Sequence, residues 1–395
     1  MKILAVCQFY HPENFTITPL LRDLAARGHQ VTVITGRPNA GFGHVLSEYR
    51  HRKFEIADGV KVHRLPILAR KKGKLSLIAN YFSFYFLARA FVRRHRGDYD
   101  VVFAMSLSPV ISMVPALDYA KRHHLPSLLY CVDIWPESVV YTNNVKPNTF
   151  AHRVLLNWSK RIYQAADRLL VGSPSYFEYM EQEHQIPRAK MDLLLQPALN
   201  EHLGIAPINH GPGTHLVYIG NLGQVQLLDE LLEAVKSLKG RDLHVHIVGN
   251  GSARDRLLAT IKNEDLSEYV HMYGYRPIHE AVAFIPDADV LLVPLKAGGY
   301  VGRTIPNKLV TYMGYGRPIL GALTGDGRAL LEAAGGGIVV EPSTRGLIEG
   351  IKRAIDLTEE EKNALGARNL AYFKEHLTLE KVGAELESYL SELVK

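Results

Sequence analysis

A strand, a glycine-containing loop and a helix follow one another in residues 288–320, and this order constrains the fold more than any other feature. Residues 290–294 form an apolar run typical of a buried strand, and residues 307–315 have the pattern of a helix. The loop between them contains Gly298, Gly299 and Gly302. The first amides of a helix lack partners and its dipole is positive there, so this unit predicts an anion site.

Two more units of this kind come earlier in the chain. Their strands, loops and helices are residues 243–248, 249–252 and 253–261, and residues 217–219, 220–223 and 227–238. Gly220, Gly249 and Gly251 in these loops are expected to let the backbone approach a ligand closely. Three such units predict a phosphate-bearing ligand at the carboxyl edge of a parallel sheet.

Side chains around residue 306 suit a bound phosphate. Pro306 is favoured as the first residue of a helix, and Thr304 or Asn307 is expected to cap it. Lys308 and Arg303 supply cations. Lys308 is the better candidate because it lies in the first helical turn; its alternative role is that of a solvated surface lysine.

Strand and helix patterns alternate along the whole chain, which predicts an α/β protein with doubly wound parallel sheets. Residues 200–215 interrupt the alternation with glycine, proline and polar residues, as an interdomain linker does. We therefore expect an N-terminal domain at residues 1–203 and a C-terminal domain at residues 214–372. Residues 373–395 are expected to form a helix that crosses back to the N-terminal domain.

The net charge of +6 conceals an asymmetry between the two halves. Residues 1–200 hold 26 basic and 15 acidic side chains, whereas the rest holds 20 and 25. Much of the excess flanks an apolar stretch of about 14 residues (75–88), which is shorter than the roughly 20 needed to span a bilayer. The pattern of residues 70–96 therefore has two interpretations. It indicates either a core helix with solvated ends or a helix that lies in a membrane interface. No nucleic-acid motif accompanies the charge.

Several tempting features have simpler interpretations. Cys7 and Cys131 lie in apolar runs and predict buried thiols in a reducing compartment, and the N-terminus is interpreted as a first strand, which favours a cytoplasmic location. Asp287-Ala288-Asp289 matches a metal-binding pattern but opens a strand. The eighteen histidines include no pair with ligand spacing beside cysteine or carboxylate, so no metal site is predicted.

Five blocks resemble the large retaining glycosyltransferase family 4, closest to its bacterial O-antigen, capsule and surface-polysaccharide branch. They are residues 19–39, 133–138 (DIWPES), 218–226 (YIGNLGQVQ), 246–252 (HIVGNGS) and 305–320. The resemblance covers nearly the whole chain. It implies the GT-B fold, with two Rossmann-like domains facing a central cleft. It also implies sugar transfer from a nucleotide diphosphate, most often UDP, with retention and without a metal or other cofactor.

The chain departs from the family pattern at the usual donor contacts. The paired glutamates of the family fall on Arg303 and Thr311, and its basic pair falls on Asn221 and Gln226. A histidine common in the family is replaced by Val132. The surface-polysaccharide branch has similar polar replacements, which implies a subtype with an altered ribose contact.

The remaining candidate residues divide between donor and acceptor. Asn221 and Gln224 offer amide donors near the glycine turn, and family position places the nucleotide base against Tyr275 and Arg276, with Thr311 at the ribose. Asp133 follows an apolar strand and is the candidate for deprotonating the acceptor hydroxyl; its alternative role is structural. The resemblance implies an acceptor loop after the first strand, and the acceptor candidates are His11, Glu13, Asn14 and Glu137.

These observations predict a metal-independent hexosyltransferase that is peripherally attached to the inner face of the cytoplasmic membrane. Its expected partners are a nucleotide sugar, with a UDP-sugar as the preferred donor, and a lipid-linked oligosaccharide carried on a polyprenyl diphosphate. Two alternatives remain: a UDP-sugar 2-epimerase of the same architecture, and a catalytically inactive protein that binds nucleotide sugars.

Overall fold

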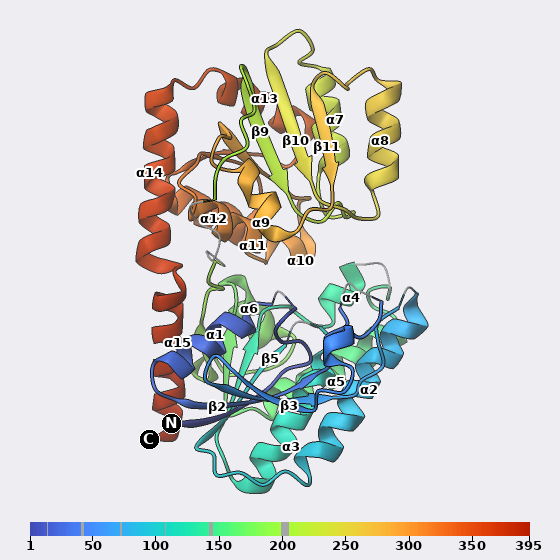
Figure 1. Cartoon of the computed structure of the whole chain (residues 1–395), viewed down its shortest axis with the longest axis vertical. Coiled ribbons are helices and arrows are strands. Elements are labelled where there is room, and N and C mark those ends of the chain that lie inside the picture. The colour runs from blue at the N-terminus through green and yellow to red at the C-terminus, as the bar shows by residue number, and fades with distance from the viewer. Residues whose placement is uncertain (14, 41–42, 72, 107, 142–144, 199–204) are drawn as a thin grey trace. The chain divides into compact units, whose positions relative to one another are not determined.

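The computed structural model describes the chain except residues 14, 41–42, 72, 107, 142–144 and 199–204. Two compact units divide it: residues 1–196 together with Leu379–Lys395, and Pro197–Thr378 (Figure 1). Each unit is an α/β sandwich with its own apolar core. The prediction of two parallel-sheet domains is confirmed.

The first unit contains an eight-stranded sheet in the order β3-β4-β2-β1-β5-β6-β7-β8. Its strands are β1 (Lys2–Val6), β2 (Gln30–Gly36), β3 (Phe54–Ala57), β4 (Val60–Leu65), β5 (Val101–Ser106), β6 (Ser127–Cys131), β7 (Arg168–Val171) and β8 (Met191–Leu193). Its helices are α1 (Ile17–Ala26), α2 (Lys74–Val92), α3 (Val114–His123), α4 (Glu137–Tyr141), α5 (Phe150–Gln164), α6 (Ser175–Gln182) and α15 (Leu379–Val394). All described pairings are parallel except β3 with β4, an edge hairpin.

The second unit contains a six-stranded, fully parallel sheet in the order β11-β10-β9-β12-β13-β14. Its strands are β9 (Thr214–Ile219), β10 (Leu243–Val248), β11 (Val270–Gly274), β12 (Val290–Pro294), β13 (Ile319–Ala322) and β14 (Gly337–Val340). Its helices are α7 (Leu228–Lys236), α8 (Arg254–Asn263), α9 (Ile278–Ala281), α10 (Gly299–Gly302), α11 (Asn307–Met313), α12 (Gly325–Ala334), α13 (Thr344–Ile355) and α14 (Glu359–His376). The order reverses between β9 and β12, the switch point where α/β sheets bind ligands.

The last helix belongs to the first unit, as predicted. Val382, Leu386 and Leu390 of α15 are fully buried in the core of that unit. The side chain of Glu387 reaches Arg27 and His29, and α15 lies beside α1 (Figure 1). Apolar spacing of i, i+4 and i+8 explains this, because those positions share one face of a helix.

Helix α2 is 19 residues long, which exceeds the uninterrupted apolar run seen in the sequence. Among the described helices it is the one long and apolar enough to cross a membrane by length and composition alone. One of its faces is nevertheless part of the first unit, where Asn80, Phe84, Ala88 and Val92 are buried. The opposite face carries exposed apolar side chains: Leu75, Ile78, Phe82 and Phe86.

Candidate functional site

The carboxyl edge of the second sheet is bare backbone. Gly220 and Gly249 directly follow β9 and β10, and Gly274 is the last residue of β11. The Gly220 amide donates to the Val248 carbonyl oxygen at 2.9 Å, and the Gly249 amide donates to the Gly274 carbonyl oxygen at 2.8 Å. Gly249 has φ +150°, and a Cβ there would lie 1.8 Å from the Gly220 carbonyl oxygen. A side chain at Gly249 is therefore excluded by the backbone of Gly220, so the main chain at this position is not covered by a side chain of its own.

Gly251, in the loop after β10, also lies too close to neighbouring backbone for a side chain. A Cβ at this position would lie 2.4 Å from the carbonyl oxygen of Leu222, whose amide donates to Asn250. The loops after β9 and β10 are thus packed against each other, and α8 begins directly behind them at Arg254.

Lys308 of α11 brings a cation to this glycine edge. Its ammonium lies 3.9 Å from the centre of the Tyr218 ring and donates to the Gln226 amide oxygen at 3.1 Å. A Cβ on Gly220 would lie 3.0 Å from the Lys308 Nζ. Burial lowers the pKa of this amine to about 7, because the charged form loses its hydration in this position. A bound anion would stabilise the charged form, so this position suits an anionic ligand.

Tyr312, one turn after Lys308, fixes α11 to the sheet. Its hydroxyl accepts the Ile219 amide at 2.8 Å, at the end of β9. Helix α11 begins at Asn307, where the predicted helical run begins, and ends at Met313, two residues before the predicted end. Its N-cap residue is Pro306, so the prediction that Thr304 or Asn307 caps the helix is wrong.

Other donor candidates surround the same edge. Arg303 and Thr304 are half-buried in the segment between α10 and α11; Thr311 is half-buried in α11, and Asn307 is exposed at its start. Residues 299–302, expected in a loop, form the single turn α10, as Figure 1 shows.

Tyr275 and Arg276 follow β11 and point away from the core. The Tyr275 side chain is 74% exposed, so its ring is free to stack on a planar group, and Arg276 pairs with Glu280 at 3.4 Å. Asn221 and Gln224 are exposed in the loop after β9. The structure thus brings the donor candidates to one edge of one sheet.

The acceptor candidate Glu13 is hydrogen-bonded to backbone amides of the protein. One of its carboxylate oxygens accepts the amides of Asn39 and Ala40 at 2.8 and 2.6 Å. The other oxygen is buried without a partner among the described residues. Burial raises the Glu13 pKa, and the two amides offset part of that rise. The Glu13 carboxylate therefore fixes the loop after β2 through one of its oxygens, and the second oxygen makes no hydrogen bond with a described residue.

A buried amide network continues from Asn39. Asn80 of α2 donates to Asn39 at 3.1 Å and to the Leu68 carbonyl at 2.5 Å, and it accepts from Gln8 at 2.8 Å. Sequence reasoning did not single out these residues. The available signal was one asparagine at position 80 within an apolar helix, because a buried amide needs partners.

Asp133 and Glu137 follow β6 in the first unit. Burial raises the pKa of Tyr81, and the nearby Asp133 carboxylate adds to that rise. Asp133 is therefore close to Tyr81 of α2. Glu137 accepts a hydrogen bond from Tyr179 at 3.1 Å and lies 3.4 Å from His152. It is consequently held by protein groups.

His11 lies next to the same buried region, and burial lowers its pKa, so its ring is neutral at pH 7. Its backbone carbonyl accepts from Arg64 at 2.6 Å. Asn14, also expected to contact the acceptor, lies outside the described residues.

The aspartates at positions 287 and 289, which were not predicted to bind a metal, have structural roles. Asp289 accepts the His215 amide at 2.6 Å and pairs with Lys362, and Asp287 accepts the His210 amide at 2.9 Å. Asp100 accepts the Lys2 amide in the same way in the first unit. Cys7 and Cys131 are buried free thiols.

Comparison with known proteins identifies the family. The glycosyl transferase 4-like domain matches residues 14–195, and the glycosyl transferases group 1 domain matches residues 213–356. The probable glycosyltransferase WbjE of Pseudomonas aeruginosa is 25% identical over 330 residues, covering 78% of this chain and 79% of WbjE. Because both domains match in order along most of the chain, it belongs to the GT-B glycosyltransferases of the family 4 type.

Two further proteins are similar. The putative colanic acid biosynthesis glycosyltransferase WcaL of Escherichia coli K12 is 28% identical over 182 residues, 45% of each chain. The crystal structure of Anabaena HepE in complex with UDP superposes with a TM-score of 0.70 at 15% identity, covering 99% of this chain and 100% of HepE. The second likeness concerns the fold alone.

Proposed function

We propose that this glycosyltransferase moves a sugar from a UDP-sugar to a polyprenyl-diphosphate-linked oligosaccharide in surface polysaccharide synthesis. The observation that carries the donor half is the Lys308 ammonium, which lies against Gly220 at the bare carboxyl edge of the second sheet. A diphosphate placed there would meet a cation and the exposed ends of three strands.

The chemistry follows from charge. As the bond between sugar and diphosphate breaks, negative charge develops on the leaving phosphate, and fixed cations and amides stabilise it without reorganising. Lys308 is assigned this role, with Arg303 as a second cation. Since these groups would carry the charge, we propose that transfer needs no metal. Retention at the anomeric carbon is proposed from the resemblance to the retaining glycosyltransferase family 4.

UDP is the favoured nucleotide because HepE, a protein of the same fold, has been crystallised with UDP. In the proposal Tyr275 stacks on the base, since its ring is largely exposed. Thr311 takes the ribose position. Asp133 in the first unit is assigned to the acceptor hydroxyl, and His11, Glu137 and the free oxygen of Glu13 to the acceptor sugar.

The acceptor is proposed from the relatives and from α2. WcaL is named for colanic acid biosynthesis, which supports a polysaccharide product. Helix α2 presents an apolar face of four exposed side chains, with Lys71 and Lys74 exposed at one end and Arg93 and Arg94 at the other. We therefore place the protein in the cytoplasm, with α2 lying on the anionic inner membrane surface.

A transfer assay tests the function. The protein is incubated with a panel of UDP-sugars labelled in the sugar, together with membranes that contain lipid-linked oligosaccharides, and label is followed into the lipid extract. Label in the extract supports transfer. Free epimerised sugar with UDP indicates an epimerase, and binding with neither product indicates an inactive binding protein; both results contradict the proposal.

A further inference from the structure

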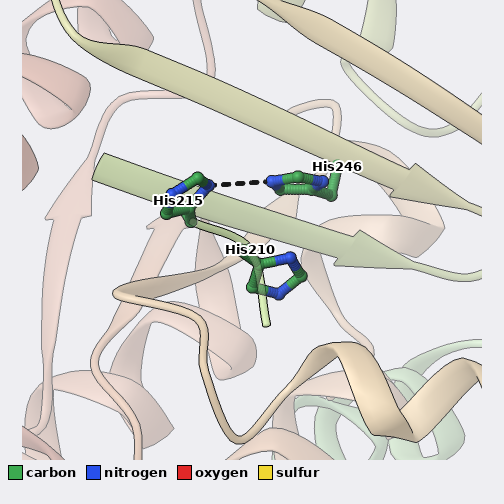
Figure 2. Close-up of side chains that lie close together, drawn as sticks. All are labelled: His210, His215 and His246. Atoms are coloured by element: carbon green, nitrogen blue, oxygen red, sulfur yellow. Dashed lines mark hydrogen bonds between the residues drawn. The ribbon is translucent and has the colours of Figure 1, made fainter. Parts of the chain in front are cut away.

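Histidine side chains gather toward the amino ends of β9, β10 and β11, on the second unit. They are His210, His215, His244, His246 and His271. Three of them, His210, His215 and His246, each offer a ring nitrogen within 4.8 Å of the other two (Figure 2). His215 and His246 come from neighbouring strands, and His210 comes from the segment that leads into β9.

The spacing of the three rings suits one metal ion. Zinc binds histidine nitrogen at about 2.0–2.1 Å, so tetrahedral ligation places ring centres roughly 5.2 Å apart. The centres lie 5.3 Å apart for His210 and His215 and 5.2 Å apart for His215 and His246. The third spacing, between His210 and His246, is 4.3 Å. His210 must therefore move outward by less than 1 Å, estimated from the same ligand geometry.

The outer nitrogens of two rings are held by carbonyl oxygens. The Nε2 of His215 lies 3.1 and 3.2 Å from the carbonyl oxygens of Gly211 and Pro212, and the Nε2 of His210 lies 2.9 Å from that of Phe284. A carbonyl only accepts, so each Nε2 carries the hydrogen and each Nδ1 keeps its lone pair. Metal-binding histidines have this arrangement, because the outer bond fixes tautomer and ring orientation.

The third ring completes the set. The Nδ1 of His246 lies 2.9 Å from the hydroxyl of Tyr273, and its Nε2 faces the Nδ1 of His215 at 3.0 Å. Tyr273 can accept from Nδ1, which frees Nε2 for a metal.

We propose that His210, His215 and His246 form a structural site for a divalent transition metal, with Zn²⁺ as the best match. Imidazole nitrogens suit zinc, and a fourth position is left for water. The ion would tie the segment before β9 to the sheet. Gly220 lies five residue steps after His215, a distance of about 16 Å along the strand, so the metal would not touch the transferred sugar.

The test uses the full chain without an affinity tag, treated with chelator and then dialysed. Calorimetric titration with ZnCl₂ at pH 7.5 should show about one equivalent bound per chain, and the melting temperature should rise with zinc, since a ligand of the folded state stabilises it. Unchanged melting and no saturable heat would overturn the proposal.

Three variants locate the site. His210→Gln changes a half-buried ring outside the strands, so folding is not at risk, and it should weaken zinc binding at least about tenfold. His246→Gln should do the same. His271→Gln is the matched control, because this ring stacks in the cluster without belonging to the triad, and binding should persist. Equal binding by His210→Gln and wild type, or loss with His271→Gln alone, would refute the assignment.

Discussion

Lys308 shows how one residue acquires a function from its neighbours. Its ammonium is enclosed by the Tyr218 ring and the Gln226 amide, and burial lowers its pKa to about 7. A group that is easily neutralised in the free protein gains its charge when an anion arrives. Anion binding at this site is therefore expected to be coupled to protonation of the amine.

Replacing Lys308 by alanine should lower kcat by about 10²–10³-fold, the range found when one charge-stabilising donor is removed. The melting temperature should not fall, because the amine is buried at a cost in free energy. Lys352→Ala, at an exposed position of α13, is the control and should leave both values unchanged. Full activity in Lys308→Ala would remove the residue from the mechanism.

The lowered pKa also predicts proton uptake. A bound diphosphate favours the charged amine, so at pH 8, where Lys308 is mostly neutral, UDP binding should take up a proton. The dissociation constant for UDP should rise by up to about tenfold per pH unit above pH 7. Calorimetry in buffers of different ionisation enthalpy measures the uptake, and Lys308→Ala should abolish it. The same uptake in the variant would contradict the assignment.

Single residues were predictable where local sequence decides and not where packing decides. Lys308 was found from its place in a first helical turn. Tyr312 was missed because its partner Ile219 is 93 residues away. Glu13 was expected to bind sugar, yet the amides of Asn39 and Ala40 occupy one of its oxygens, a contact that no local pattern indicates.

At the scale of elements, α2 has two unlike faces. Asn80, Phe84, Ala88 and Val92 face the core, and the exposed apolar side chains face solvent. The buried amide of Asn80 bonds to Gln8, Asn39 and the Leu68 carbonyl, which fixes the rotation of the helix. The exposed face is thus presented in a defined direction.

Charge reversal tests the membrane proposal. Changing Lys71, Lys74, Arg93 and Arg94 to glutamate should weaken binding to vesicles rich in anionic lipid by at least about a hundredfold, since each cation near such a surface contributes about 1 kcal/mol. Sedimentation with vesicles measures it. Lys352→Glu with Arg353→Glu in the second unit is the control. Undiminished sedimentation of the α2 variant would contradict the proposal.

Most helices and strands were predictable from the period of their apolar residues and from the glycine and proline residues that bound them. The exceptions have physical reasons. The edge strand β3 was not singled out because four residues with alternating exposure give a weak signal. The turn α10 was expected to be a loop because glycine is a poor helix former. The switch point between β9 and β12 could not be derived, since strand order depends on tertiary packing.

At the scale of the whole chain, the two units share a parallel-sheet α/β architecture, and each carries the candidate residues for a different proposed ligand. The donor candidates lie on one sheet edge of the second unit, and the acceptor candidates and α2 belong to the first. The histidine triad escaped sequence analysis because its members are 5 and 31 residues apart and meet only through the pairing of β9 with β10.

Chelation should therefore have two separable effects. EDTA should leave the initial rate of transfer unchanged, because in the proposed mechanism Lys308 and Arg303 stabilise the phosphate charge. It should lower the melting temperature of zinc-loaded protein to that of His210→Gln. Loss of transfer that Mg²⁺ or Mn²⁺ restores would show that the metal-independent mechanism is wrong.

The most direct test of the central claim, that the second unit binds a nucleotide diphosphate, is a thermal-shift titration with UDP, GDP, ADP, CMP and their sugar conjugates. Binding to the folded state alone adds roughly 2.7 kcal/mol of stability at a hundredfold excess over Kd. We predict a rise in melting temperature with UDP compounds that is reduced in Lys308→Ala. No shift with any nucleotide would contradict the account.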